Sequence, residues 1–253
     1  MTMNSGQTIK EFNGHSGSKV YLMQDDIRLF VRKEGNVERN FERLHVLDHH
    51  GLPVPRIYKY VSGQTLEMEY LHGLDMKNYL KSHDTDNLCE FLKVLFVKFI
   101  NDGAISSLKD YTEVYHQKLE WLNDSYGFPF TKDELIDRLP KFLPKSTYHG
   151  DLTLDNIIHT SDKFYMIDAI TSEYDSFIFD IAKLRQDLEC KWFIRNYDLK
   201  LDVKLKNLQD DILSYFPNSD DDNLLILMLL RVYPYVDVND KDYILKEIKR
   251  LWK

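Results

Sequence analysis

The sequence predicts an α+β protein in which a small antiparallel β-sheet with one main helix precedes a larger, mostly helical part. Residues 9–32 alternate short apolar runs with turns rich in Gly, Ser and Asp, a pattern typical of antiparallel strands. From residue 74 onward, apolar residues instead recur at helical spacing over several long segments. These two patterns predict two parts, covering residues 1–73 and 74–253.

The composition is that of an ordinary globular protein, with 43% hydrophobic and 29% charged residues among 253. The net charge of −8 argues against a nucleic-acid-binding protein, which needs concentrated Lys and Arg to neutralise phosphates. Cys89 and Cys190 are too few for a disulfide framework or a zinc site. No apolar run approaches the roughly 18 residues of a membrane span, and no signal-peptide pattern is present. These features predict a cytoplasmic enzyme and leave its oligomeric state open.

Small residues occupy the turn between the first two predicted strands. Ser16, Gly17 and Ser18 leave backbone N–H groups free to approach phosphate oxygens, although most turns of this composition are plain hairpins. The third strand ends in Lys33. On residue type alone, Lys33 is either a phosphate-binding cation or, as is commoner for lysine, an exposed surface residue.

A helix is predicted after Lys33. Its apolar positions, which recur at helical spacing, are Val37, Phe41, Leu44 and Leu47. Gly51 ends the pattern. Glu38 and Glu42 lie one turn apart on this helix and share a face, so either carboxylate is a candidate partner for Lys33.

Two further strands complete the N-terminal part. One covers residues 56–61, and Gly63 turns the chain into another over residues 65–71. The second strand carries Glu69 and Leu71 just before the boundary between the two parts. From the residues alone it is either a plain edge strand or the connection into the helical part.

The helical part begins with a broad apolar face over residues 88–100. A second helix is predicted over residues 111–122. Thr131 and Glu134 form a capping box for a third, which Pro140 ends. These apolar stripes predict core helices, and we assign them no chemistry.

The motif that best indicates chemistry is Tyr148-His149-Gly150-Asp151-Leu152-Thr153-Leu154-Asp155-Asn156. Two short apolar runs follow it, separated by a turn over residues 160–162, and predict a hairpin that places Asn156 and Asp168 at the same edge. One amide and one carboxylate there would suit Mg²⁺ held against nucleotide phosphates. Asp151 would orient a hydroxyl and accept its proton.

This arrangement resembles the aminoglycoside phosphotransferase and choline kinase superfamily, which has the protein-kinase-like fold. The residues that carry the resemblance are His149-Gly150-Asp151, Asn156, Ile167-Asp168 and Phe179-Asp180-Ile181-Ala182. The resemblance implies a bilobal molecule. Residues 1–73 would form a nucleotide-binding lobe ending in a hinge, and residues 74–253 a helical lobe with the catalytic loop and the acceptor site.

The resemblance also implies roles for the residues of the loop. Asp151 would be the catalytic base, and Asn156 and Asp168 the metal ligands. His149 is expected to be structural, and Asp180 to anchor the loop by hydrogen bonds to its backbone.

For the nucleotide, the resemblance implies that the turn over residues 16–18 and Lys33 bind the phosphates of ATP. A glutamate of the following helix would hold Lys33; we favour Glu42 because Leu47 follows it, and Glu38 stays possible. The Glu69 carbonyl and the Leu71 N–H would bind the adenine edge.

We therefore expect an ATP- and Mg²⁺-dependent kinase that phosphorylates a hydroxyl of a sugar, polyol or amino alcohol. The alternatives are a nucleotide-binding pseudokinase or scaffold, an aminoglycoside-modifying phosphotransferase, and a protein kinase. Ala169-Ile170, where protein kinases have Phe-Gly, argues against the last. Candidate residues for the acceptor site are Gln186, Asp187, Arg231, Tyr233 and Tyr235. Asp187 could instead be a surface residue, and the two tyrosines core residues.

Overall fold

The computed structural model describes residues 6–12, 18–102, 107–123 and 126–253. The chain forms two compact units. The first consists of Met1–Tyr79 and Asp155–Thr171, and the second of Leu80–Leu154 and Ser172–Lys253. The predicted division at residue 73 did not anticipate that Asp155–Thr171, which begins inside the motif over residues 148–156, belongs to the first unit.

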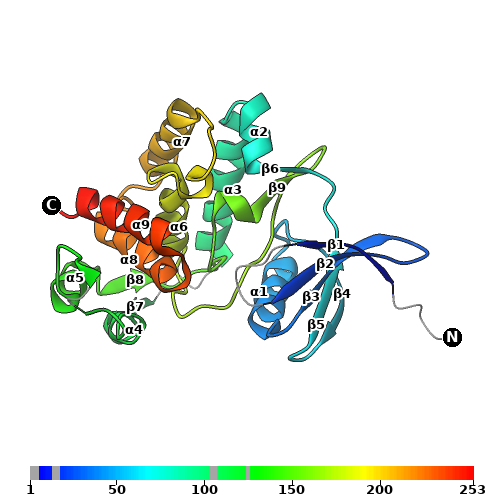
Figure 1. The fold of residues 1–253 in the computed structure, drawn as a ribbon, viewed down its shortest axis with the longest axis horizontal. Helices are drawn as coiled ribbons and strands as arrows, with labels where there is room; N and C mark the ends of the chain where they lie inside the picture. The colour runs from blue at the N-terminus through cyan, green and yellow to red at the C-terminus, as the bar shows by residue number, and fades with distance from the viewer. Residues whose placement is uncertain (1–5, 13–17, 103–106, 124–125) are drawn as a thin grey trace. The chain divides into compact units, whose positions relative to one another are not determined.

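An antiparallel sheet of five strands forms most of the first unit (Figure 1). Its strands are β1 (Gln7–Phe12), β2 (Lys19–Gln24), β3 (Leu29–Glu34), β4 (Ile57–Val61) and β5 (Thr65–Glu69), in the order β1-β2-β3-β5-β4. The helix α1 (Glu38–His49) follows β3 and buries Leu44 and Leu47 completely. The sheet and its single helix therefore agree with the predicted small β-lobe.

A second, three-stranded sheet belongs to the same unit. It consists of β6 (Leu74–Asp75), β9 (Ile157–His159) and β10 (Phe164–Met166), in the order β10-β9-β6. The predicted hairpin is confirmed, since Phe164 pairs with His159 and Met166 with Ile157. A Cβ at Gly73 would lie 2.3 Å from the His159 carbonyl oxygen, so only glycine allows β6 to approach β9 this closely.

The second unit is mostly helical. After α2 (Met76–Ser82), which leads into it, its helices are α3 (Asp86–Asp102), α4 (Thr112–Lys118), α5 (Lys132–Arg138), α6 (Phe177–Leu188), α7 (Asp202–Tyr215), α8 (Asp222–Val232) and α9 (Val238–Leu251). The capping box of α5 forms as predicted, with the Thr131 and Glu134 side chains each accepting from the other's backbone N–H. No helix in the described part of the chain is long and apolar enough to cross a membrane.

The core of the second unit is built around α8, which packs against both α6 and α9 (Figure 1). Every residue from 224 to 230 is buried, so this helix is apolar on all sides. A short antiparallel pair, β7 (Leu108–Asp110) and β8 (Phe142–Pro144), was not predicted. Each strand has three residues, too few for a period-of-two pattern to be recognised.

Candidate active site

Helix α6 carries an unusual number of buried polar side chains. All residues from 179 to 188 are buried, and the polar ones among them are Asp180, Lys183, Arg185, Gln186 and Asp187. A buried charge destabilises the fold unless it is paired or hydrogen-bonded. The hydrogen-bond and ion-pair partners of these side chains therefore show which part of the chain the helix stabilises.

Asp180 holds the start of the motif over residues 148–156. Its carboxylate accepts hydrogen bonds from the backbone N–H groups of His149 at 2.5 Å and Gly150 at 2.9 Å. Gly150 has a φ of 90°, in the region that favours glycine, so the His-Gly step allows both N–H groups to reach one carboxylate. These bonds confirm the expected anchoring by Asp180.

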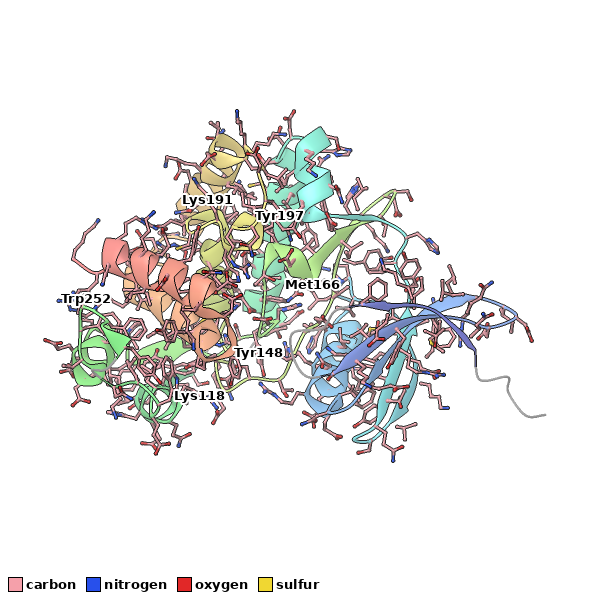
Figure 2. All side chains as sticks on the ribbon, in the orientation of Figure 1. Lys118, Tyr148, Met166, Lys191, Tyr197 and Trp252 are labelled. Atoms are coloured by element: carbon pink, nitrogen blue, oxygen red, sulfur yellow. The ribbon has the colours of Figure 1, made fainter. Side chains whose placement is uncertain are left out.

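His149 is completely buried, and its Nδ1 accepts the backbone N–H of Asp151 at 3.3 Å. This contact agrees with the structural role expected for the histidine. Just before it, Tyr148 (labelled in Figure 2) donates its hydroxyl hydrogen to the Ser172 carbonyl at 3.1 Å. The loop is thus tied to the segment that leads into α6.

Asp187 holds the other end of the same motif. Its carboxylate accepts the backbone N–H of Leu154 at 2.6 Å, and the residue is completely buried. The interpretation of Asp187 as a surface residue is therefore wrong. Asp180 and Asp187 are seven residues apart, about two helical turns, so both face the loop from one side of α6.

Asp151 lies between these two anchoring points and is paired with a lysine that the sequence did not indicate. Lys183 Nζ lies 3.3 Å from Asp151 Oδ1; the side chains are 7% and 36% exposed, respectively. Lys183 follows Asp180 by one helical turn, and this spacing was the only available signal for it. The proposed base is therefore partly accessible, whereas its cationic partner is not.

A second cation reaches the loop from α8. Arg231 Nη2 donates to the Gly150 carbonyl at 3.1 Å. Burial raises the pKa of the Asp151 carboxyl, but the positive charge of Lys183, and then the electrostatic influence of Arg231 and of the His149 ring, hold that pKa below its ordinary value. Asp151 is therefore ionised near neutral pH, as a group that accepts a proton must be.

The first unit gathers Lys33, Asn156 and Asp168. Lys33 Nζ lies 3.1 Å from Asp168 Oδ1; the lysine is 4% exposed and the aspartate 47%. The Asn156 carbonyl accepts the backbone N–H of Ile167 at 2.9 Å, which brings this residue to the strand end that precedes Asp168. Asp168 has a φ of 57°, a left-handed conformation that is uncommon for a residue with a side chain and often marks functional sites.

Lys33 and Glu42 are both described, and the predicted ion pair between them is not formed. Glu42 is exposed, because α1 turns Asn40 and Arg43 inward together with its leucines. Asn40 Nδ2 donates to the Ala169 carbonyl at 3.0 Å, next to Asp168. Lys33 is paired with Asp168 instead.

Glu38 has a different partner again. Its Oε2 accepts hydrogen bonds from the Tyr60 hydroxyl at 2.5 Å and the Ser62 hydroxyl at 3.1 Å. The Tyr60 bond is the main reason why the pKa of Glu38 is lowered. Glu38 therefore fixes the start of α1 to β4 and the turn that follows it.

The remaining nucleotide-binding predictions concern backbone groups. Ser16 and Gly17 lie outside the described residues, and Ser18 is buried immediately before β2. Glu69 is the last residue of β5, and its N–H donates to the Arg56 carbonyl at 2.9 Å. Leu71 follows in a segment without regular structure. The proposed adenine contacts at these two residues stay predictions.

The candidate acceptor residues are placed very differently from one another. Gln186 is completely buried, Tyr233 belongs to the core as the alternative interpretation held, and Tyr235 is 85% exposed. Arg231 is partly exposed and also lies with its guanidinium 5.1 Å from the ring of Tyr174. Of these five described candidates, Arg231 combines solvent access with a hydrogen bond to the motif over residues 148–156.

Solved structures share this fold at low sequence identity. A thermostable mutant of aminoglycoside phosphotransferase APH(4)-Ia, in a ternary complex with AMP-PNP and hygromycin B, aligns with a TM-score of 0.67 and 11% identity over 99% of this chain and 95% of its own. A glucosamine kinase in complex with glucosamine, ADP and inorganic phosphate aligns with a TM-score of 0.62 and 11% identity over 93% and 80%. The predicted protein-kinase-like fold is thereby confirmed.

The family model described as the phosphotransferase enzyme family matches residues 8–202. A search of curated proteins found no match to the chain. The family match begins in β1 and ends at the start of α7, so it includes the whole motif over residues 148–156 and both residues of the proposed metal site. The match covers most of the sequence and agrees with the superfamily expected from the motifs, and the chain belongs to the phosphotransferase enzyme family.

Proposed function

We propose that this phosphotransferase is a small-molecule kinase that transfers the γ-phosphoryl group of ATP to a hydroxyl of a sugar, polyol or amino alcohol. The observation that carries the proposal is a partly exposed Asp151, paired with Lys183, on a loop that is held at both ends by Asp180 and Asp187. Phosphoryl transfer depends mainly on positioning and charge stabilisation, so a rigidly held base is what the reaction requires.

In this proposal Asp151 accepts a hydrogen bond from the acceptor hydroxyl and takes its proton as the oxygen attacks the γ-phosphorus. General bases of this kind contribute about 10²- to 10⁴-fold to the rate. The depressed pKa keeps the carboxylate ionised over the neutral range, which supports the role. Its partial exposure leaves room for a substrate hydroxyl to approach.

Lys33, Asn156 and Asp168 would bind the phosphates of the nucleotide and its Mg²⁺. Mg²⁺ is usually bound by one or two protein oxygens together with phosphates and water, and an amide and a partly exposed carboxylate suit it. When bound, the ion would neutralise charge on the transferred phosphoryl group. The buried ammonium of Lys33, fixed by Asp168, is a compact cation of the kind that binds phosphate oxygens.

The charges around Asp151 disfavour an acceptor that carries several positive charges. Lys183 and Arg231 place two positive charges beside one carboxylate. A polycationic aminoglycoside would meet like charge there. Hygromycin B and glucosamine are bound by the similar proteins and not by this one, and both classes of compound remain in the test below.

The test is a screen of sugars, polyols, amino alcohols and aminoglycosides with Mg·ATP, measuring ADP release. We expect turnover with members of the first three classes, and about 10²- to 10⁴-fold lower kcat for Asp151→Asn with nucleotide binding retained. Asp155→Asn is the matched control, because Asp155 belongs to the same motif but lies at the surface, paired with Lys77.

Other results would contradict the proposal. If Mg·ATP neither raised the melting temperature nor turned over with any acceptor, the protein would be a scaffold on the kinase-like fold. Labelling of polypeptides alone would indicate a protein kinase. Turnover with aminoglycosides alone would identify an antibiotic-modifying enzyme.

A further inference from the structure

We propose that Lys183 is a positioning residue, which holds the Asp151 carboxylate in one orientation toward the acceptor hydroxyl. The inference rests on the proposed function, because it assigns to Asp151 the role of base. It is based on the ion pair of 3.3 Å between Lys183 Nζ and Asp151 Oδ1, in which the lysine is almost completely buried.

The ammonium of Lys183 is itself fixed. Nζ donates to Gln186 Oε1 at 3.2 Å, one helical turn further along α6, as well as facing Asp151. The Gln186 Nε2 atom is buried and has no hydrogen-bond partner within the described residues. A buried donor without a partner lowers the stability of the fold, so the side chain of Gln186 stabilises the protein only through its oxygen, which accepts from Lys183. A surface lysine would lose side-chain entropy on pairing, whereas this one is already ordered by its burial.

The position of the loop backbone is determined by other contacts. The Asp180 carboxylate accepts the N–H groups at the start of the motif, and the Asp187 carboxylate accepts the N–H of Leu154. Lys183 lies on α6 between Asp180 and Asp187. It is paired with the Asp151 side chain rather than with the backbone of the loop. One helix therefore holds the loop with its carboxylates and orients the base with its ammonium.

The titratable groups that face Asp151 come from three elements. They are the cations Lys183 on α6 and Arg231 on α8 and the His149 ring in the loop itself, and the electrostatic influence of each lowers the pKa of the carboxyl. Asp180 and Asp187 also lie on α6, but their carboxylates are engaged with backbone N–H groups. Removal of the Lys183 charge therefore raises the pKa of Asp151. In the pH profile of kcat/KM, the acid limb, which is the fall in rate as Asp151 becomes protonated, then moves to higher pH.

The experiment compares Lys183→Met, Lys183→Gln and Lys183→Arg in the full chain, with the acceptor found in the screen. We expect about 10- to 100-fold lower kcat for the Met and Gln variants, a small part of what a general base contributes. KM for ATP should stay within about 2-fold, and the acid limb should shift upward. The Arg variant retains the charge, so its acid limb should stay near that of the wild type.

Lys109→Met is the matched control. Lys109 forms an ion pair of 2.6 Å in the same unit, with Asp175 rather than with Asp151. We expect no shift of the acid limb in this variant. A folded Lys183→Met protein with the kcat and acid limb of the wild type would overturn the proposal. If that variant does not fold, equal acid limbs in the Gln and Arg variants would overturn it.

A second measurement separates this proposal from the proposed function. The carboxyl carbon of Asp151 can be titrated by ¹³C NMR, with Asp151→Asn for assignment. A higher pKa in the Gln variant than in the wild type supports the pairing even if no acceptor is turned over, in which case the kinase proposal alone fails. An unchanged pKa in an active enzyme means that Lys183 does not act on the base.

Discussion

The carboxylate of Asp187 and the backbone N–H of Leu154 form a hydrogen bond of 2.6 Å inside the second unit. It is the counterpart of the two bonds that Asp180 accepts at the other end of the same loop. The proposed catalytic loop is therefore held by a single helix at two points about two turns apart. The stability of the loop can be tested separately from its chemistry.

Asp187→Ala should destabilise the protein, because the Leu154 N–H would lose its buried partner. An unsatisfied buried donor costs about 1 to 3 kcal/mol. Urea unfolding measures this loss. The control is Asp198→Ala, an exposed carboxylate, for which we expect a change within about 0.5 kcal/mol. Equal unfolding free energies for the two variants would show that the bond contributes nothing.

Asp168→Ala should remove the dependence of nucleotide binding on Mg²⁺. The carboxylate is the stronger of the two proposed metal ligands, and its loss also leaves the buried Lys33 ammonium without its ion pair. The measurement is the thermal shift produced by ATP with and without Mg²⁺. We expect a larger shift with Mg²⁺ in the wild type and equal shifts in the variant. A variant that keeps the Mg²⁺ effect would exclude Asp168 as a ligand.

Glu42 and Asn40 offer a direct comparison on α1. Asn40→Ala removes the donor to the buried Ala169 carbonyl next to Asp168, so we expect a loss of about 1 to 3 kcal/mol in stability and a higher KM for ATP. Glu42→Ala changes an exposed side chain, and its KM for ATP should equal that of the wild type. A large increase in KM for the Glu42 variant would mean that Glu42 pairs with Lys33 when nucleotide is bound.

Glu189 should make stability depend on acid pH. Burial raises its pKa, but the bond from Arg185 and the charges of Arg185 and Arg250 hold the pKa below the ordinary value. The folded protein therefore binds this proton less readily than the unfolded chain. The stabilisation is complete above the unfolded pKa of about 4.3 and is lost as the pH falls through the lower folded pKa.

Glu189→Gln tests this effect, since it keeps the shape and removes the titration. The free energy of unfolding is measured by urea between about pH 3 and pH 7. We expect the variant to be less stable than the wild type at neutral pH and the difference to shrink in acid. A difference that is constant over this range would show that Glu189 does not carry the effect.

The prediction of the hairpin that leads from Asn156 to Asp168 succeeded because its signals were local. The short runs before and after residues 160–162 form a hairpin whose register depends only on neighbouring residues, and it brings Asn156 close to Asp168. The capping box at Thr131 and Glu134 was recognised for the same reason. The partner of Lys33 was not predicted correctly, because it depends on which face α1 turns inward. Glu38 and Glu42 share one face of the helix, and their spacing could not show that α1 buries Asn40 and Arg43 instead.

What the sequence determined by itself was the family, the α+β architecture and the order of the proposed catalytic and metal-binding residues along the chain. Those features are contained in short motifs and in apolar periodicity. Only the tertiary structure decided that Lys33 pairs with Asp168, that Asp187 is a buried anchor, and that Lys183 faces Asp151. A buried charge is stabilised by whichever opposite charge or hydrogen-bonding group the fold brings within reach, and these partners lie far apart in sequence.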